Sequence, residues 1–286
     1  MTAQPNSETA PVALVTGASS GIGERTVHDL LGQGMTVYAV ARRVERMAGL
    51  AAAGARVLAM DVTDTTSIER GVARIVDEAG RIDVLVNNAG YGAYGAVEDV
   101  PDAQARRQFD VNLFGLAHLT RLVLPGMRQR GRGRIINVSS IAGTLYEPLG
   151  AWYHASKAAL DRFSDCLRVE VAPLGIQVVT VRPAGIRTEW NEGARASLHD
   201  VSGSGAYARQ VPGVNLILRS LEGRVLGNEV ATVARDITRA ATAARPAPII
   251  ASGRGAALAM WVFRTVPPRL LDEAVEWVVR AGSGRR

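Results

Sequence analysis

The chain has 286 residues, of which 47% are hydrophobic and 21% are charged, a globular composition that excludes a disordered or fibrous protein. Its net charge is +6, and Lys157 is the only lysine among its 33 basic residues. The one cysteine, Cys166, excludes an intrachain disulfide and favours a reducing compartment. Residues 1–11 lack the features of a secretory signal, and no apolar run reaches the roughly 18 residues that span a bilayer. We therefore expect a cytoplasmic protein without a transmembrane segment.

Short apolar segments alternate with helical patterns along most of the chain. Seven segments have the Val, Ile and Leu content of buried strands, at 12–16, 35–41, 56–60, 84–86, 134–138, 177–181 and 248–251. Helical periodicity is found between them, in a helix that ends near Gln33 and at 65–79, 103–130, 152–171 and 228–243. This alternation predicts an α/β fold with a doubly wound parallel sheet of about seven strands, formed by one domain over residues 1–286.

Two segments interrupt the alternation. Residues 184–226 are rich in Gly, Ser, Arg and Asn and have weak periodicity, which is typical of a substrate lid, although an ordinary surface excursion has the same composition. The tail at 256–281 has an apolar run, two prolines and then an amphipathic pattern. The sequence leaves open whether this helical tail packs on the protein's own body, covers the site, binds a partner chain or touches a membrane.

A glycine-rich turn follows the first predicted strand. In T-G-A-S-S-G-I-G, at 16–23, Gly17, Gly21 and Gly23 stand between a strand and the start of a helix. Such a turn lets the backbone approach a pyrophosphate closely, and the helix N-terminus offers free N–H groups to the anion. The segment therefore predicts a dinucleotide-binding site.

The second predicted strand ends at Arg42 and Arg43. An NAD-binding fold places an acidic residue near this point, against the ribose 2′-hydroxyl. Two guanidinium groups there favour the 2′-phosphate of NADP(H), because arginine binds phosphate oxygens in a forked geometry. If both arginines are instead solvated, NAD(H) remains open.

Tyr153 and Lys157 are four residues apart in a helical pattern, so both side chains lie on one helix face. A positive charge about 4 Å from a phenol lowers its pKa by about three units at an effective dielectric constant near 20. The pair predicts a tyrosine that exchanges protons near neutral pH, although a core tyrosine beside a solvated lysine has the same spacing. Polar residues that follow two other strands, at 87–90 and 139–140, favour one site at the carboxyl edge of the sheet.

Five motifs occur together: T-G-A-S-S-G-I-G at 16–23, N-N-A-G at 87–90, Asn112 in D-V-N-L-F-G, Ser140 in N-V-S-S, and Tyr153-x-x-x-Lys157. Together they resemble the motifs of the short-chain dehydrogenase/reductase family, in its single-domain branch. The resemblance extends from about Val12 to Thr188 and implies a Rossmann fold.

The resemblance also implies roles for individual residues. Tyr153 would be the general acid/base, and Ser140 would hydrogen-bond the substrate oxygen. Lys157 would hold the nicotinamide ribose and lower the tyrosine pKa, and Asn112 would hold a helix kink and a water in a proton relay. With the glycine turn and the two arginines, the predicted cofactor site consists of Gly17, Ser19, Ser20, Gly21, Ile22, Gly23, Arg42, Arg43, Asp61, Val62, Asn88, Ala89, Gly90, Tyr153, Lys157, Pro183, Ile186 and Thr188. Ala184 departs from the family, which has glycine at that place.

We therefore predict an NADP(H)-dependent oxidoreductase that interconverts a ketone or aldehyde and an alcohol by hydride transfer. The alternatives are other nicotinamide chemistry on the same fold, such as C=C reduction or epimerisation, and a non-catalytic NADPH sensor. The substrate is an unidentified small molecule, and the tryptophans of the apolar tail, Trp261 and Trp277, hint that it is hydrophobic. The resemblance implies a homodimer or homotetramer formed through helices around 103–130 and 152–172.

Other partners are not expected. The arginine-rich segment 128–134 has no interleaved aromatic side chain, so we interpret it as a solvated loop and expect no nucleic acid. The four histidines have no metal-ligand spacing, so we expect no metal. Cys166 lies within a helical pattern and is interpreted as a packing residue.

Overall fold

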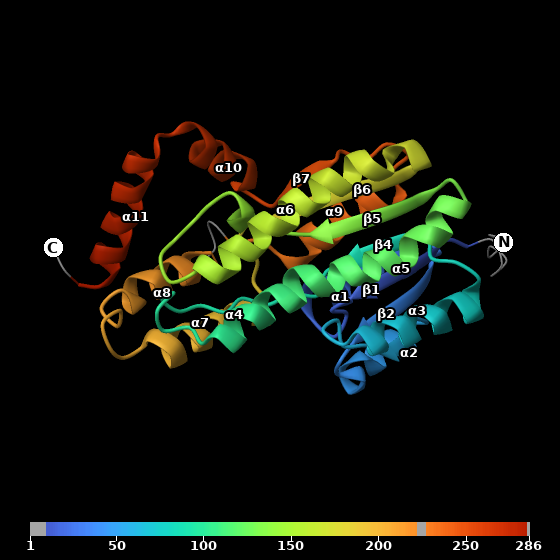
Figure 1. Cartoon of the computed structure of the whole chain (residues 1–286), viewed down its shortest axis with the longest axis horizontal. Coiled ribbons are helices and arrows are strands. Elements are labelled where there is room, and N and C mark those ends of the chain that lie inside the picture. The colour runs from blue at the N-terminus through green and yellow to red at the C-terminus, as the bar shows by residue number, and fades with distance from the viewer. Residues whose placement is uncertain (1–9, 222–226, 285–286) are drawn as a thin grey trace.

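Seven parallel strands form one sheet in the order β3-β2-β1-β4-β5-β6-β7, which confirms the predicted doubly wound architecture (Figure 1). The computed structural model describes residues 10–221 and 227–284. The strands are β1 (Val12–Thr16), β2 (Thr36–Ala41), β3 (Arg56–Ala59), β4 (Val84–Asn87), β5 (Gly133–Val138), β6 (Ile176–Pro183) and β7 (Ile249–Ser252). All seven fall on predicted segments.

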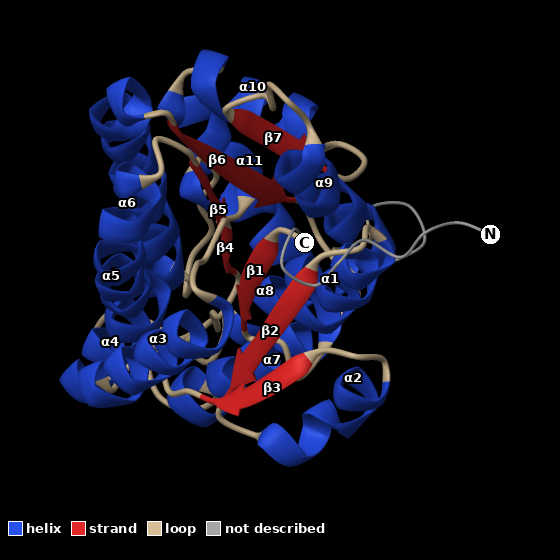
Figure 2. Ribbon diagram, turned by 90° about the vertical axis from the view of Figure 1, so that its right-hand side faces the viewer, coloured by secondary structure: helices blue, strands red, loops and turns tan. Residues whose placement is uncertain are grey.

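The helices cover both faces of this sheet and continue beyond its carboxyl end. They are α1 (Gly21–Gly32), α2 (Ala48–Ala52), α3 (Thr65–Ala79), α4 (Asp102–Phe109), α5 (Gly115–Gln129), α6 (Ala151–Val171), α7 (Glu189–Ser202), α8 (Val211–Ser220), α9 (Val230–Thr242), α10 (Ala256–Thr265) and α11 (Pro268–Gly282). In Figure 2, α3, α5 and α6 lie on one side of the strands, and α1, α2 and α9 lie on the other.

Alternation along the strands divides the core into two clusters. In β1, Ala13 and Val15 pack with side chains of α1 and α9, whereas Val12 and Leu14 pack with side chains of α3, α5 and α6. A strand that is buried on both faces needs apolar residues at consecutive positions, which is the pattern that predicted these strands. The two clusters together hold the carboxyl ends of the strands in one row.

The predicted helix at 103–130 is divided into three parts. Helix α4 ends at Phe109, a π-helical turn η2 (Asp110–Phe114) follows, and α5 begins at Gly115. A Cβ at Gly115 would clash with the carbonyl oxygen of Val62, so the start of α5 lies directly against the loop after β3. The wider turn places Asn112 in the interior, and such turns often occur at functional sites.

The segment 184–226 is more regular than its composition predicted. Within its described part, α7 and α8 are helical, so the expected irregular structure is not found there; residues 222–226 lie outside the described residues. The substrate lid stays a prediction. The buried positions Val211, Val214 and Leu218 have helical spacing, a signal that the neighbouring proline and glycine obscured. Residues 1–9, which form most of the segment 1–11 that lacks the features of a secretory signal, also lie outside the described residues.

The C-terminal tail packs on the protein's own body. Met260 of α10 and Leu271 and Val279 of α11 are buried, and α11 packs against α8. The outer faces of both helices carry large exposed side chains, including Trp261 and Trp277. In Figure 1, α7, α8, α10 and α11 gather towards one end of the molecule.

The exposure of Cys166 and the character of the helices bear on two predictions from the sequence. Cys166 is exposed on α6, so its interpretation as a packing residue is wrong: the buried face of this helix includes Ser164 and Leu167 but not Cys166. Of the helices that the structure describes, none is both long and apolar enough to cross a bilayer.

The contact between α8 and α11 depends on Gly213. A Cβ at this position would clash with the backbone of Val279, and a Cβ at Gly282 would lie 2.8 Å from the Cα of Gly213. We expect Gly213→Ala to lower the free energy of unfolding by about 1 to 3 kcal/mol, because the added methyl group forces the backbones of α8 and α11 apart. Chemical denaturation measures this change.

The matched control is Gly193→Ala in α7, where an added Cβ meets nothing within 4 Å. That substitution should raise the free energy of unfolding by about 0.5 to 1 kcal/mol, because alanine is the better helix former. Equal effects of the two substitutions would contradict the close packing of α8 on α11.

Candidate active site

A cleft of about 880 Å³ lies at the carboxyl ends of the strands. The strand order reverses between β1 and β4, and open α/β sheets bind their ligands at such a point. The walls come from the turns after β1 to β6, from α6 and from the C-terminal helices. All of the predicted site residues line this cleft except Gly23 and Asn112.

The turn after β1 has a shape that only glycine adopts easily. Gly17 and Gly21 have φ angles of 65° and 58°. A Cβ at Gly17 would lie 2.9 Å from the Cα of Ala89, and a Cβ at Gly23 would clash with the carbonyl oxygen of Gly17. Gly23 thus lies directly against the backbone of the turn at Gly17. Helix α1 begins in this turn, and its N-cap residue Ser20 makes no side-chain capping bond, so first-turn N–H groups are available to a phosphate.

Thr16 joins this turn to the turn after β4. Its Oγ1 accepts hydrogen bonds from the backbone N–H groups of Asn88 and Ala89, each at 3.0 Å. In return, the side-chain amide of Asn88 donates to the carbonyl oxygen of Thr16 at 3.0 Å. The two turns therefore hold each other in place, and the cleft floor between them is rigid.

Arg42 and Arg43 are exposed at the edge of the cleft, after β2. Asp61 follows the neighbouring strand β3 and also lines the cleft. Burial raises the pKa of Asp61, but hydrogen bonds from Thr63 and the charge of Arg42 outweigh burial, so this pKa lies below its ordinary value. The edge therefore presents two exposed cations, which suit a phosphate group, beside one ionised carboxylate.

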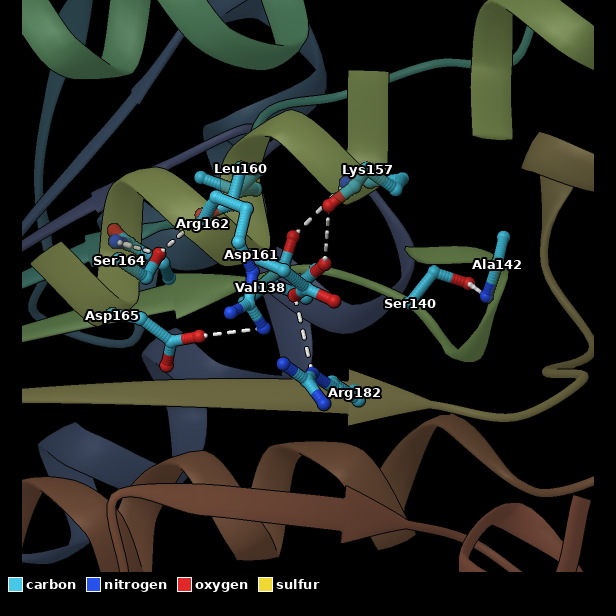
Figure 3. A network of polar contacts seen from close by, with 12 residues as sticks. Val138, Ser140, Ala142, Lys157, Leu160, Asp161, Arg162, Ser164, Asp165 and Arg182 are labelled. Carbon is cyan, nitrogen blue, oxygen red and sulfur yellow. Dashed lines mark hydrogen bonds and ion pairs between the residues drawn. The ribbon is translucent and has the colours of Figure 1, made fainter. Parts of the chain in front are cut away.

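Ser140 and Tyr153 meet on the other side of the cleft. Ser140 follows β5, and its Oγ accepts a hydrogen bond from the backbone of Ala142 at 3.1 Å (Figure 3). Tyr153 is buried in the first turn of α6, and Ser140 hydrogen-bonds its phenol. The Tyr153 ring packs against Trp190 and Tyr94, with ring centroids 4.9 and 5.9 Å apart.

Burial dominates the acidity of Tyr153. It raises the pKa of Tyr153 to about 12, and the nearby charge of Glu147 acts in the same direction, while the hydrogen bond with Ser140 acts against it. This direction is opposite to the one that we expected from Lys157 alone. The expectation considered only the attraction between the lysine cation and the phenolate, at a fixed dielectric constant. It omitted the loss of hydration that disfavours the phenolate when Tyr153 is buried. In this state the phenol is a proton donor at neutral pH.

Lys157 lies one helical turn after Tyr153 and is buried. Its Nζ donates to the carbonyl oxygen of Val138 at 3.0 Å. Burial lowers the pKa of Lys157 to about 8, against the opposing charge of Asp161. Asp161 is itself paired with Arg182 at 3.1 Å, and both are almost completely buried, as Figure 3 shows.

Asn112 is held by hydrogen bonds to Ser156 and Tyr91. Its Nδ2 donates to Ser156 Oγ at 3.0 Å and to the carbonyl oxygen of Tyr91 at 3.1 Å, and its Oδ1 accepts from the backbone of Tyr91. A Cβ at Gly90 would lie 3.2 Å from Asn112 Oδ1 and 3.6 Å from Lys157 Nζ. Asn112 and Lys157 therefore border the same glycine, although Asn112 does not line the cleft.

The loop after β6 closes the cleft beside the glycine turn. Pro183, Ile186 and Thr188 line the cleft, and a Cβ at Gly21 would lie 3.5 Å from Thr188 Cγ2. The side chain of Asn191 donates to the carbonyl oxygen of Ile186 and holds this loop against α7. Ala184, which stands in place of the expected glycine, also lines the cleft.

Sequence reasoning missed several residues of the cleft. Trp190 forms an aromatic wall with Tyr153, and Glu147 accepts a hydrogen bond from Tyr94 at 2.9 Å while lying 3.7 Å from His154 Nε2. These residues come from loops and a helix whose composition has no distinctive chemical pattern. The spacing of Asp161, four residues after Lys157, was a visible signal that was not used. In the described part of the chain, no three His, Cys, Asp or Glu side chains form a group that could hold a metal ion.

Comparison with known proteins identifies the same region. A family model described as short chain dehydrogenase matches residues 11–199. A 3-ketodihydrosphingosine reductase from Bacteroides thetaiotaomicron is 39% identical over 186 residues, which cover 65% of this chain and 68% of that protein.

Two solved structures resemble the whole chain. A short-chain dehydrogenase from Streptomyces avermitilis has a TM-score of 0.78 and 34% identity, and the match covers 95% of this chain and 97% of that one. A short chain dehydrogenase from Burkholderia cenocepacia J2315, crystallised in complex with NADP, has a TM-score of 0.71 and 27% identity, with 93% of this chain and 98% of that chain covered.

The burial of Lys157 can be measured directly because the chain has one lysine. Protein that contains isotope-labelled lysine should give one side-chain NMR signal, with a titration midpoint near pH 8 in the absence of ligands. An exposed lysine titrates near 10.4. The variant Lys157→Arg, which lacks the signal, confirms its assignment. A midpoint above pH 10 would contradict a buried, poorly solvated amine.

The lowered pKa of Lys157 also makes its contribution to the free energy of unfolding depend on pH. The unfolded lysine binds its proton more tightly than the folded one, so this contribution is least favourable below pH 8. It becomes more favourable by up to about 3 kcal/mol as the pH rises from 8 towards 10.5. Wild-type protein should therefore gain stability relative to Lys157→Met over that range.

Proposed function

The chain belongs to the short-chain dehydrogenase/reductase family, and on that premise we propose that it is an NADP(H)-dependent reductase of a ketone or aldehyde. The observation that carries the proposal is one continuous cleft, which joins the glycine turn and Arg42 to Ser140, Tyr153 and Lys157. The residues present fit a nicotinamide dinucleotide, since the turn after β1 leaves no room for a Cβ and ends at an open helix N-terminus. When bound, the cofactor supplies the hydride.

Tyr153 would supply the proton. Its raised pKa keeps the phenol protonated at neutral pH, so it can donate to a carbonyl oxygen as that oxygen gains negative charge. Ser140, which hydrogen-bonds the phenol, would bind the same carbonyl oxygen and orient it. In the reverse direction, Tyr153 would accept the proton of the alcohol.

Lys157 and Asn112 would assist the proton transfer by Tyr153. The amine of Lys157 is held by Val138 and lies on the Tyr153 side of α6, where it would bind the ribose of the cofactor. Asn112 holds the π-helical turn and borders the same glycine as Lys157, which supports a role in passing protons towards the interior.

Arg42 and Arg43 support NADP(H) as the cofactor. Both are exposed at the end of β2, where the charge of Arg42 already acts on Asp61. The proposal also includes a homodimer or homotetramer formed through the helices around 103–130 and 152–172. Phe114 and Val169 are exposed hydrophobic side chains of these segments, and the molar mass in solution tests this part of the proposal.

We expect Tyr153→Phe to lower the turnover of carbonyl substrates by about 10² to 10⁴, because the proton donor is removed. Binding of NADPH, measured by its fluorescence, should be retained. The control is Tyr91→Phe: Tyr91 lines the same cleft, and its buried hydroxyl has no hydrogen-bond partner within the described part of the chain. If Tyr153→Phe kept full turnover, or if the wild type reduced only the C=C bond of an enone, the proposed chemistry would be wrong.

We expect Arg42→Asp to move the ratio of kcat/KM for NADPH over NADH towards NADH by roughly 10- to 100-fold, because a charge-assisted bond to the 2′-phosphate is replaced by repulsion. The control is Arg70→Asp, at an exposed position of α3 that does not line the cleft. An unchanged ratio in Arg42→Asp would remove the basis for assigning NADP(H).

A further inference from the structure

The cleft continues beyond Tyr153 into a part that we call the C-terminal groove. Its walls come from α8, from the residue after α8, and from α10 and α11. The principal lining side chains are Ile217, Leu221, Val262, Phe263, Leu271 and Val275. This part of the chain lies after residue 199, where the match to the family model ends.

No charged residue of α8, α10 or α11 lines the groove in the described structure. The charged lining residues come from other elements, as Arg42, Glu147 and Lys157 do. Ser220 is the one hydroxyl that these three helices place there, and it donates to the carbonyl oxygen of Ile217 at 2.7 Å. A polar substituent in the groove would therefore lose its bonds to water without gaining new ones, whereas an apolar group would gain by leaving water.

The walls of the groove are held close to the catalytic residues. Tyr146, in the loop between Ser140 and α6, donates a hydrogen bond to Asp272 of α11 at 3.0 Å. The Tyr146 ring also packs edge-on against Phe263 of α10, with centroids 5.3 Å apart. The groove is thus fixed relative to the proton donor, and a molecule with its carbonyl group at Tyr153 extends into it.

We propose that the substrate is a carbonyl compound with a long aliphatic chain, which lies in the C-terminal groove while its carbonyl group is at Tyr153. This inference rests on the proposed function. Five of the six principal lining side chains are aliphatic, and Phe263 is the one aromatic ring among them, so most of this lining offers contact along a flexible chain.

The first test is a series of methyl ketones from butanone to decanone, with NADPH as the reductant. Each methylene that enters the groove should raise kcat/KM by about two- to fourfold until the groove is filled, because burial of a methylene transfers it out of water. A rise of this kind supports the proposal. A flat series, or a preference for a rigid polycyclic ketone over decanone, overturns it.

Two pairs of variants locate the effect in the groove. Ala274→Phe fills space at an exposed lining position of α11, so it should lower the ratio of kcat/KM for decanone over that for butanone about tenfold or more. Its control is Ala281→Phe, at an exposed position of the same helix that does not line the cleft. Equal activity of Ala274→Phe and Ala281→Phe towards decanone contradicts the proposal.

The second pair changes polarity. Val275→Asp places a carboxylate in the groove and should also act against decanone, whereas Leu270→Asp places one on the exposed outer part of α11 and should not. Binding of decanol, measured by calorimetry with NADPH bound so that no hydride acceptor is present, should weaken in Val275→Asp and remain in Leu270→Asp. If both variants bind decanol as the wild type does, the chain does not lie in the groove.

These outcomes separate the substrate class from the proposed function. Reduction of butanone that depends on Tyr153, without any gain for longer ketones, would leave the reductase assignment intact and reject the aliphatic chain. Binding of decanol that depends on Val275, without reduction of any ketone, would support the groove and reject the reductase assignment.

Discussion

Burial of two ionisable side chains on one turn of α6 is the constraint on which the site depends. It moves the pKa of Tyr153 up and that of Lys157 down, so both groups are shifted towards their uncharged forms. The cost is tolerated because each group is held: Ser140 hydrogen-bonds the phenol, and Val138 accepts from the amine. Any cation or anion that enters the cleft therefore acts on groups that water does not screen.

Most of the fold and the position of the site follow from local pattern. Consecutive apolar residues predicted all seven strands, and glycine, serine and asparagine after them predicted the edge at which the cleft lies. The acidity of Tyr153 could not be predicted in this way, because it depends on burial by Trp190 and Tyr94, which are far from it in the sequence. The ion pair of Asp161 with Arg182 is likewise created by the packing of α6 on β6.

The cleft joins two parts of different character. The part formed by the turns after β1 to β5 uses backbone geometry and charge, which short motifs reveal. The part formed by α8, α10 and α11 uses aliphatic contact, for which many side chains serve equally well. The two meet at Tyr146, whose ring and hydroxyl connect the catalytic loop to α10 and α11. Substrate choice can therefore change by substitution in the last third of the chain without disturbing the proton donor.

The order of the elements along the chain has a consequence for synthesis, because α11 follows every element that forms the glycine turn and carries Tyr153 and Lys157. The glycine turn, Tyr153 and Lys157 all leave the ribosome before the helix that encloses the groove, and domains generally begin to fold from their N-terminal side. A nascent chain therefore has its dinucleotide cradle before it has a complete pocket. Docking of α11 against Gly213 adds one wall of the pocket, so removal of α11 would leave the cradle without that wall.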